Sequence, residues 1–210
     1  MSLFNLPKST IVDRNIPKNA FDSHINQKQK KLFTEVIEKI RWTNKISRET
    51  INLGGTEISE IQLFEIQIRS KENLQDVLEI MDKAIPYHII FVVSFENQFI
   101  LSTSKKHKNP TNEDRAIIDW TFTTVWFEEK NNHYQFNLSQ NIDFIYADFC
   151  SQLVSISLEN QPIDVLITQE RDQNKLQKKI HQLENAITRE KQFNKKIALN
   201  LELQRLKSRH

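Results

Sequence analysis

Side chains able to act as nucleophiles or metal ligands are few and scattered in this sequence of 210 residues. The one cysteine, Cys150, lies in the apolar stretch DFIYADFCSQLV, a setting typical of a small buried core residue. The six histidines pair with no cysteine, carboxylate or other histidine at a spacing typical of a metal site. The two glycines, Gly54 and Gly55, are adjacent, which excludes a P-loop and a dinucleotide-binding fingerprint. We therefore assign no catalytic residue, metal ligand or cofactor, and the sequence favours a protein that is not an enzyme.

One acidic pattern leaves a nuclease as an alternative. Metal-dependent nucleases of the restriction type place an acidic residue and a Glu-x-Lys pair on adjacent strands, where carboxylates can hold Mg²⁺. The stretch EISEIQLFEIQIRS carries Glu60 and Glu65, but Gln67 stands where the lysine of the pair belongs. Strands also alternate Glu and Gln simply to face solvent. A degenerate restriction-type nuclease fold stays an alternative, and the metal or nuclease role of Glu60 and Glu65 stays open.

The charge of the chain is unevenly distributed. Residues 168–210 contain eleven Lys or Arg and five Asp or Glu, whereas the preceding 167 residues contain eighteen and twenty-two. An acidic body is thus followed by a basic tail with a net charge of +6. Such a split indicates that the tail binds a molecule that the body does not bind, or that the tail and the body contact each other. Lys191, Lys195, Lys196 and Arg205 are candidates for contacts with nucleic-acid phosphates. The alternative is that these cations flank a coiled-coil seam and only keep it hydrated.

The tail itself is predicted to be one long helix. No Pro or Gly occurs between about Val165 and Lys207, and a helix of some 40 residues would be roughly 60 Å long. Its apolar residues form an imperfect coiled-coil seam with a polar interruption, and we predict self-association or partner binding through Leu176, Ile180, Leu183, Ile187, Ile197 and Leu201. A lone helix cannot bury such a stripe, so we expect it to pack against a second copy, another protein or its own body.

Periodicity predicts an α+β body. Leu32, Phe33, Val36, Ile37 and Ile40 recur at helical spacing, which predicts a helix over about residues 26–40. Further along the chain, the patterns predict a half-buried strand within EISEIQLFEIQIRS, a helix in KENLQDVLEIMDKAI, a central strand HIIFVVSF paired with QFILST, a polar loop SKKHKNPTNEDR, a second hairpin formed by DWTFTTVWF and HYQFNL, and a helix in IDFIYADFCSQLV. The expected fold is a mixed sheet flanked by helices, with a long coiled-coil-like C-terminal helix.

The expected organisation is a globular domain over residues 1–163 and a basic helix over residues 164–210. The N-terminus MSLFNLPKST lacks a signal-peptide pattern, and no apolar run approaches the ~20 residues that span a bilayer. We expect a cytoplasmic protein that does not contact the membrane.

Several phrases, in order along nearly the whole chain, resemble the bacterial family called domain of unknown function 4391. They are FNLPKST, NIPKNAF, IEKIRWTNKISRETINL, EISEIQLFEI, IPYHIIF and REKQFNKKIALNLELQRLK. The residues that carry the resemblance are Pro7, Lys18, Phe21, Trp42, Lys45, Thr50, Asn52, Glu60, Pro86 and Glu190–Gln192. Members of this family are often encoded beside helicases and DNA methyltransferases, in restriction or phage-defence clusters.

The resemblance therefore implies an accessory subunit of a DNA-processing system, and it supplies no catalytic residues. Such a subunit would bind a helicase or methyltransferase partner, or form a homo-oligomer, through its C-terminal helix. The alternative is a nucleic-acid-binding protein that contacts DNA with the basic tail.

Overall fold

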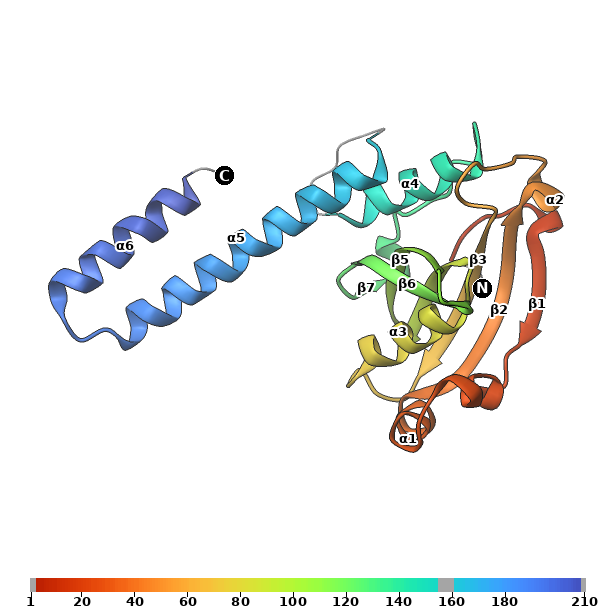
Figure 1. The fold of residues 1–210 in the computed structure, drawn as a ribbon, viewed down its shortest axis with the longest axis horizontal. Coiled ribbons are helices and arrows are strands. Elements are labelled where there is room, and N and C mark those ends of the chain that lie inside the picture. Colours follow the sequence, from red (N-terminus) through yellow and green to blue (C-terminus); the bar gives the residue numbers. More distant parts are fainter. Residues whose placement is uncertain (1–2, 155–160, 209–210) are drawn as a thin grey trace. The chain divides into compact units, whose positions relative to one another are not determined.

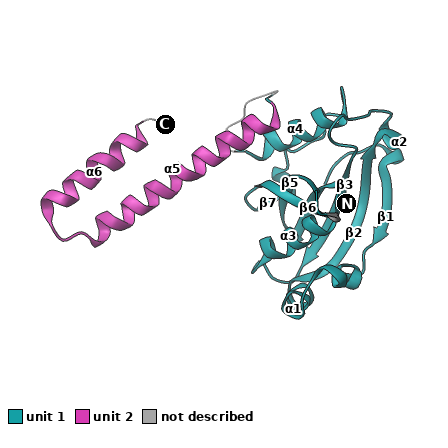
Figure 2. Cartoon of the chain, viewed as in Figure 1, with its two compact units in different colours: residues 1–161 teal, residues 162–210 magenta. Residues whose placement is uncertain are grey.

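In a computed structural model, the chain forms two compact units, residues 1–161 and 162–210 (Figure 2). The structure describes residues 3–154 and 161–208. The first unit contains a seven-stranded sheet with its helices, and the second contains two helices.

The strands of the first unit are β1 (Ile11–Asn15), β2 (Ile37–Ser47), β3 (Glu60–Ile68), β4 (His88–Phe95), β5 (Gln98–Asn109), β6 (Asn112–Thr123) and β7 (Phe127–Glu128). Its α-helices are α1 (Gln27–Val36), α2 (Arg48–Ile51), α3 (Leu74–Ala84) and α4 (Ile142–Leu153). Three short 3₁₀ segments are η1 (Lys8–Thr10), η2 (Lys18–His24) and η3 (Glu129–Asn131). The second unit consists of α5 (Ile163–Arg189) and α6 (Phe193–Lys207).

The strands follow the order β1-β2-β3-β4-β5-β6, and β7 pairs with β5 (Figure 1). All neighbours are antiparallel except β3 and β4, which are parallel and joined through α3. A parallel pair needs such a crossover, because the chain must return to the end of the sheet where β3 began before it can enter β4 in the same direction. The predicted α+β class, with a mixed sheet, flanking helices and a long C-terminal helix, is confirmed.

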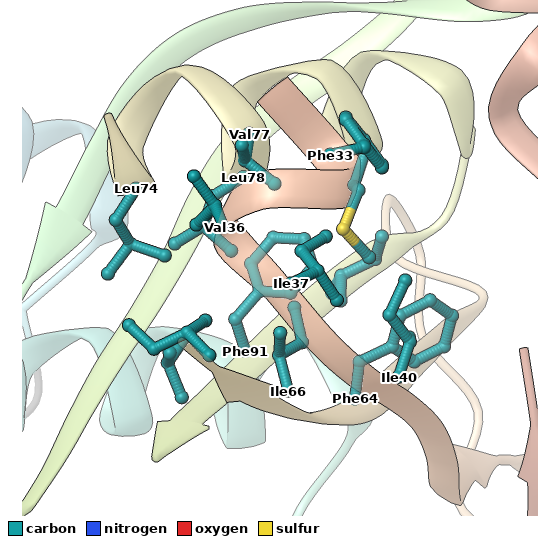
Figure 3. Close-up of a cluster of buried hydrophobic side chains, with 14 of the residues drawn as sticks. Phe33, Val36, Ile37, Ile40, Phe64, Ile66, Leu74, Val77, Leu78 and Phe91 are labelled. Carbon is teal, nitrogen blue, oxygen red and sulfur yellow. The ribbon is translucent and has the colours of Figure 1, made fainter. Parts of the chain in front are cut away.

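The main core lies between the sheet and the helices α1 and α3 (Figure 3). The predicted stripe of α3 is buried through Leu74, Val77, Leu78 and Met81. The central strand β4 is covered on both faces, as its uninterrupted apolar sequence predicts: residues 89–93 are all buried. The two faces of β4 are therefore covered by different layers, and α1 and α3 belong to the layer on one face.

The predicted helix over residues 26–40 is wrong in its second half. Helix α1 ends at Val36, and Ile37 already pairs with Ile68 in the sheet. A register shift between Ile37 and Lys39 places both Ile37 and Ile40 in the core beside α1. Because a bulged strand can bury residues three apart, the spacing of these two residues fits a strand as well as a helix.

The predicted polar loop and second hairpin are also wrong. The loop sequence SKKHKNPTNEDR lies mostly within β5 and β6, which pair along their length and turn at residues 110–111. Strand β6 therefore uses β5 as its partner, with Phe122 opposite Thr103. The stretch HYQFNL, residues 133–138, forms no strand in the part of the chain that the structure describes.

Candidate interaction surface in the C-terminal unit

The basic tail is a helical hairpin, so the prediction of one uninterrupted helix is wrong. Helix α5 ends at Arg189, Glu190 and Gln192 have extended backbones, and α6 begins at Phe193. The Glu190 carboxylate accepts a hydrogen bond of 2.8 Å from the Gln192 backbone N–H. The break coincides with the polar interruption of the seam, where a further helical turn would bury no apolar side chain.

The hairpin is held by ion pairs between its two helices. Lys179 of α5 lies 3.1 Å from Glu202 of α6, and Lys207 of α6 lies 2.8 Å from Glu184 of α5. The hydrogen bond from Lys207 lowers the pKa of the Glu184 carboxyl. All four side chains are about half exposed, so these contacts orient the helices more than they stabilise them.

The predicted seam is divided between the two helices. In α5, Leu183 is buried and Leu176, Ile180 and Ile187 are partly buried. In α6, the partly buried residues are Leu199, Leu203 and Leu206, which lie off the predicted seam. We attribute the shielding of the α5 residues to α6, which packs along α5. The two remaining predicted residues, Ile197 and Leu201, are 43% and 50% exposed.

An apolar stripe remains open to solvent on α6. Phe193 is 75% exposed, and with Ile197 and Leu201 it follows the i, i+4, i+8 spacing of one helix face. We call these three residues the α6 stripe. Phe193 is not among the predicted seam residues, because it falls outside the heptad phase of α5. The available signal was its four-residue spacing to Ile197, which becomes meaningful once α6 is treated as a new helix.

The predicted nucleic-acid contacts surround the hairpin turn and α6. Lys191 lies in the turn, Lys195 and Lys196 lie in the first turn of α6, and Arg205 lies near its end. All four are exposed, and none forms an ion pair within the described part of the chain. At about 100° per residue, Lys195, Lys196 and Arg205 point in different directions rather than forming one row. Arg209, which contributes to the basic count, lies outside the described residues.

Glu60 and Glu65 do not share a site. They lie five residues apart on β3, so their side chains leave opposite faces of the sheet. Glu60 accepts a hydrogen bond of 2.6 Å from Gln62, and Glu65 lies beside Arg41. Among residues 3–154 and 161–208, no group of three or more His, Cys, Asp or Glu side chains is placed to hold a metal ion.

Cys150 lies on α4, and His88 contacts Tyr146 of the same helix. Cys150 is fully buried, and burial raises the pKa of its thiol. The ring of His88 meets the ring of the buried Tyr146 edge to face at 4.7 Å. Burial, and then the charge of Lys106, lower the pKa of His88 to about 4. Both groups are therefore neutral near pH 7, and a neutral thiol is a poor nucleophile.

A family model described as Domain of unknown function (DUF4391) matches residues 4–209 of the chain. No curated protein and no solved structure matches the chain. In the described residues, no helix is both long enough and apolar enough to cross a membrane.

Proposed function

The chain belongs to the DUF4391 family, and on that premise we propose that it is a non-catalytic accessory subunit of a bacterial DNA-processing system. The subunit binds a partner enzyme through its C-terminal hairpin. The partner class follows from the family resemblance, which implies helicases and DNA methyltransferases of restriction or phage-defence clusters. Such a complex would act in the cytoplasm.

The observation that carries this proposal is the α6 stripe. Phe193, Ile197 and Leu201 stay exposed although α6 already packs against α5. Burying a large apolar side chain contributes roughly 1.5–3 kcal/mol. A partner that covers the stripe therefore gains several kcal/mol, which is enough to select one surface among many.

The charge of α6 favours a partner protein over a second copy. The helix carries four Lys or Arg and one Glu. Two copies that pair through their α6 stripes would bring like charges together, and like-charge juxtaposition costs affinity. We infer that the partner offers an apolar groove with an acidic rim, and that the isolated protein is a monomer.

The test compares two matched double variants. Ile197→Asp with Leu201→Asp adds two negative charges to the α6 stripe. Gln177→Asp with His181→Asp adds the same charge to exposed positions of α5, also four residues apart. Each version is co-expressed with a helicase or DNA methyltransferase from the restriction or phage-defence clusters that the family resemblance implies, and the mass of the purified complex is measured by light scattering.

We expect a complex with the unchanged protein and the α5 variant, and a loss of at least tenfold in affinity with the α6 variant. Far-UV circular dichroism checks that both variants keep their helices. A complex that forms equally well with the α6 variant would contradict the proposal. A stable dimer of the protein alone that the α6 variant dissociates would instead establish self-association.

A second candidate function is nucleic-acid binding. It is favoured by the four exposed cations Lys191, Lys195, Lys196 and Arg205, which form no ion pair among the described residues. Their neutralisation to Gln should reduce both the affinity for DNA and its salt dependence, by about one unit of slope per phosphate contact. Binding that is insensitive to salt would exclude this function.

A further inference from the structure

The turn between α5 and α6 consists of Glu190, Lys191 and Gln192, and it contains none of the residues that commonly end one helix and begin the next. Many helices end with a glycine or asparagine in a left-handed conformation, whereas α5 ends at Glu190 in an extended conformation. Many helices begin after Ser, Thr, Asp or Asn, whereas α6 begins after Gln192, whose side chain makes no capping hydrogen bond in the described chain. The residues of the turn therefore do little to require a turn.

The same three residues favour a helix. Glu, Lys and Gln are among the better helix formers, and no Pro or Gly occurs from Ile163 to Lys207. A continuous helix would also give intrahelical partners to the carbonyl groups at the end of α5 and to the N–H groups at the start of α6. The contact between the two helices, rather than the turn itself, therefore keeps the chain folded back.

The contact between α5 and α6 has the same composition whether it forms within one chain or between two. It includes the buried Leu183 and two ion pairs, Lys179 with Glu202 at 3.1 Å and Lys207 with Glu184 at 2.8 Å. Both ion pairs join a residue of α5 to a residue of α6. The α6 helix of a second copy can therefore replace the chain's own α6 and restore the same contacts, which is the basis of domain swapping.

We propose that two copies of the protein exchange their α6 helices. In the exchanged dimer, residues 163–207 of each chain form one continuous helix, and each α6 packs on α5 of the other copy. The former turns meet at the twofold axis, where Glu190 of one copy and Lys191 of the other carry opposite charges. Two basic α6 helices do not pair with each other, because each α6 contacts α5.

The exchange depends on protein concentration. A short turn holds α6 beside α5 at an effective concentration in the millimolar range, so the monomer predominates in dilute solution and the dimer accumulates as the protein is concentrated towards that range. The α6 stripe takes no part in the exchange, so the inference does not depend on the proposed partner enzyme.

A distance within one chain distinguishes the two forms. Spin labels are attached through Gln177→Cys on α5 and Gln204→Cys on α6, both exposed positions, while the native Cys150 is buried. Doubly labelled full-length protein is mixed with an excess of unlabelled protein, so that the measured distance joins two labels of the same chain. The axes of packed helices lie about 8–10 Å apart, whereas residues 177 and 204 of a continuous helix are about 40 Å apart.

Two substitutions at one position of the turn form a matched pair. Lys191→Ala and Lys191→Gly remove the same charge and differ in helix propensity. Because the exchanged dimer contains two continuous helices, Lys191→Gly should weaken it at least tenfold relative to Lys191→Ala. Light scattering between about 10 µM and about 1 mM protein measures this difference.

We expect the long distance in the dimer and the short distance in the monomer. Ile197→Asp with Leu201→Asp should leave dimer formation within twofold, which separates the exchange from partner binding through the α6 stripe. A dimer that keeps the short distance, equal dimer formation by the two Lys191 variants, or loss of the dimer in the α6 double variant would overturn the proposal. A monomer at the highest concentration, for both the unchanged protein and Lys191→Ala, would overturn it as well.

Discussion

Lys106→Met should strongly destabilise the first unit, because it removes one partner of a buried ion pair. The Lys106 side chain is fully buried, and its Nζ lies 2.5 Å from Asp82 Oδ1. The same ammonium donates to two backbone carbonyls at the end of α3, Asp82 O at 2.7 Å and Ile85 O at 2.8 Å. One side chain thus joins β5 to the C-terminus of α3.

The magnitude follows from what the variant leaves behind. Methionine fills nearly the same volume, so the cost of a cavity is small. The Asp82 carboxylate, 2% exposed, loses its counter-charge, and breaking a buried pair in this way costs about 3–5 kcal/mol. With an m-value of about 2 kcal/mol/M, a loss of ~4 kcal/mol lowers the urea midpoint by roughly 2 M.

The loss should also depend on pH. Burial raises the pKa of Asp82, while Lys106 opposes that rise, so the variant raises this pKa further above the unfolded value of about 3.9. A carboxyl whose folded-state pKa is raised destabilises the fold when it is ionised. The penalty is therefore complete above the folded-state pKa and disappears as the pH falls towards the unfolded value. The gap between variant and unchanged protein should be wider at pH 8 than at pH 5.

Urea titration followed by tryptophan fluorescence measures this loss, because all three tryptophans belong to the first unit. Lys108→Met, at an exposed position two residues along β5, is the matched control and should change the free energy of unfolding by less than about 0.5 kcal/mol. Adding Asp82→Leu to Lys106→Met should restore part of the stability, because no charge then stays buried. A midpoint within 0.5 M of the unchanged protein at both pH values would refute the reasoning.

Three further substitutions test other parts of the structure. Gly55→Ala should cost about 1–3 kcal/mol in the same urea assay, because a Cβ there would lie 2.1 Å from the Ile58 carbonyl oxygen; an unchanged midpoint would show that this loop yields freely. Asp143→Asn should cost about 1–3 kcal/mol, because the carboxylate accepts hydrogen bonds from the three consecutive backbone N–H groups of residues 56–58, and a lost acceptor leaves donors unpaired. Leu183→Ala should cost about 2–4 kcal/mol of hairpin stability, seen as an earlier loss of far-UV helical signal on heating, and an unchanged melting curve would argue against a packed hairpin.

Elements with one dominant period could be predicted from the sequence. The helical spacing of Leu74, Val77, Leu78 and Met81 requires no knowledge of the rest of the chain, and α3 lies where it predicts. The same is true of the uninterrupted apolar run of β4. These patterns succeed because a buried face fixes the period of the element that carries it.

Long-range pairing explains what the sequence could not predict. Lys106 lies between Lys105 and His107 in a run that is locally indistinguishable from a polar loop. Its burial depends on Asp82, 24 residues earlier in the chain. No local pattern identifies which lysine of such a run finds a buried carboxylate. The β-ribbon that contains it was missed for the same reason.

The candidate surface shows a related limit. The polar interruption near Glu190 can be located from the sequence. The heptad phase of α5, carried across this interruption, assigns Phe193 to no seam. A break of three residues starts a new helix with its own phase. Leu183 and Ile197, which were expected to belong to one seam, consequently differ: Leu183 is buried and Ile197 is 43% exposed.

The hairpin also changes which assemblies the tail can support. An unbroken rod would leave six seam residues uncovered, whereas the hairpin shields those of α5 and leaves the three residues of the α6 stripe. At about 150–250 Å² for each large side chain, the exposed part of the stripe amounts to roughly 300 Å². A stable interface buries about 800 Å² on each partner. The stripe alone is therefore too small to hold an obligate dimer. It fits better as the apolar centre of a larger contact. The basic side chains around the stripe, together with a partner of opposite charge, would form the rim of that contact.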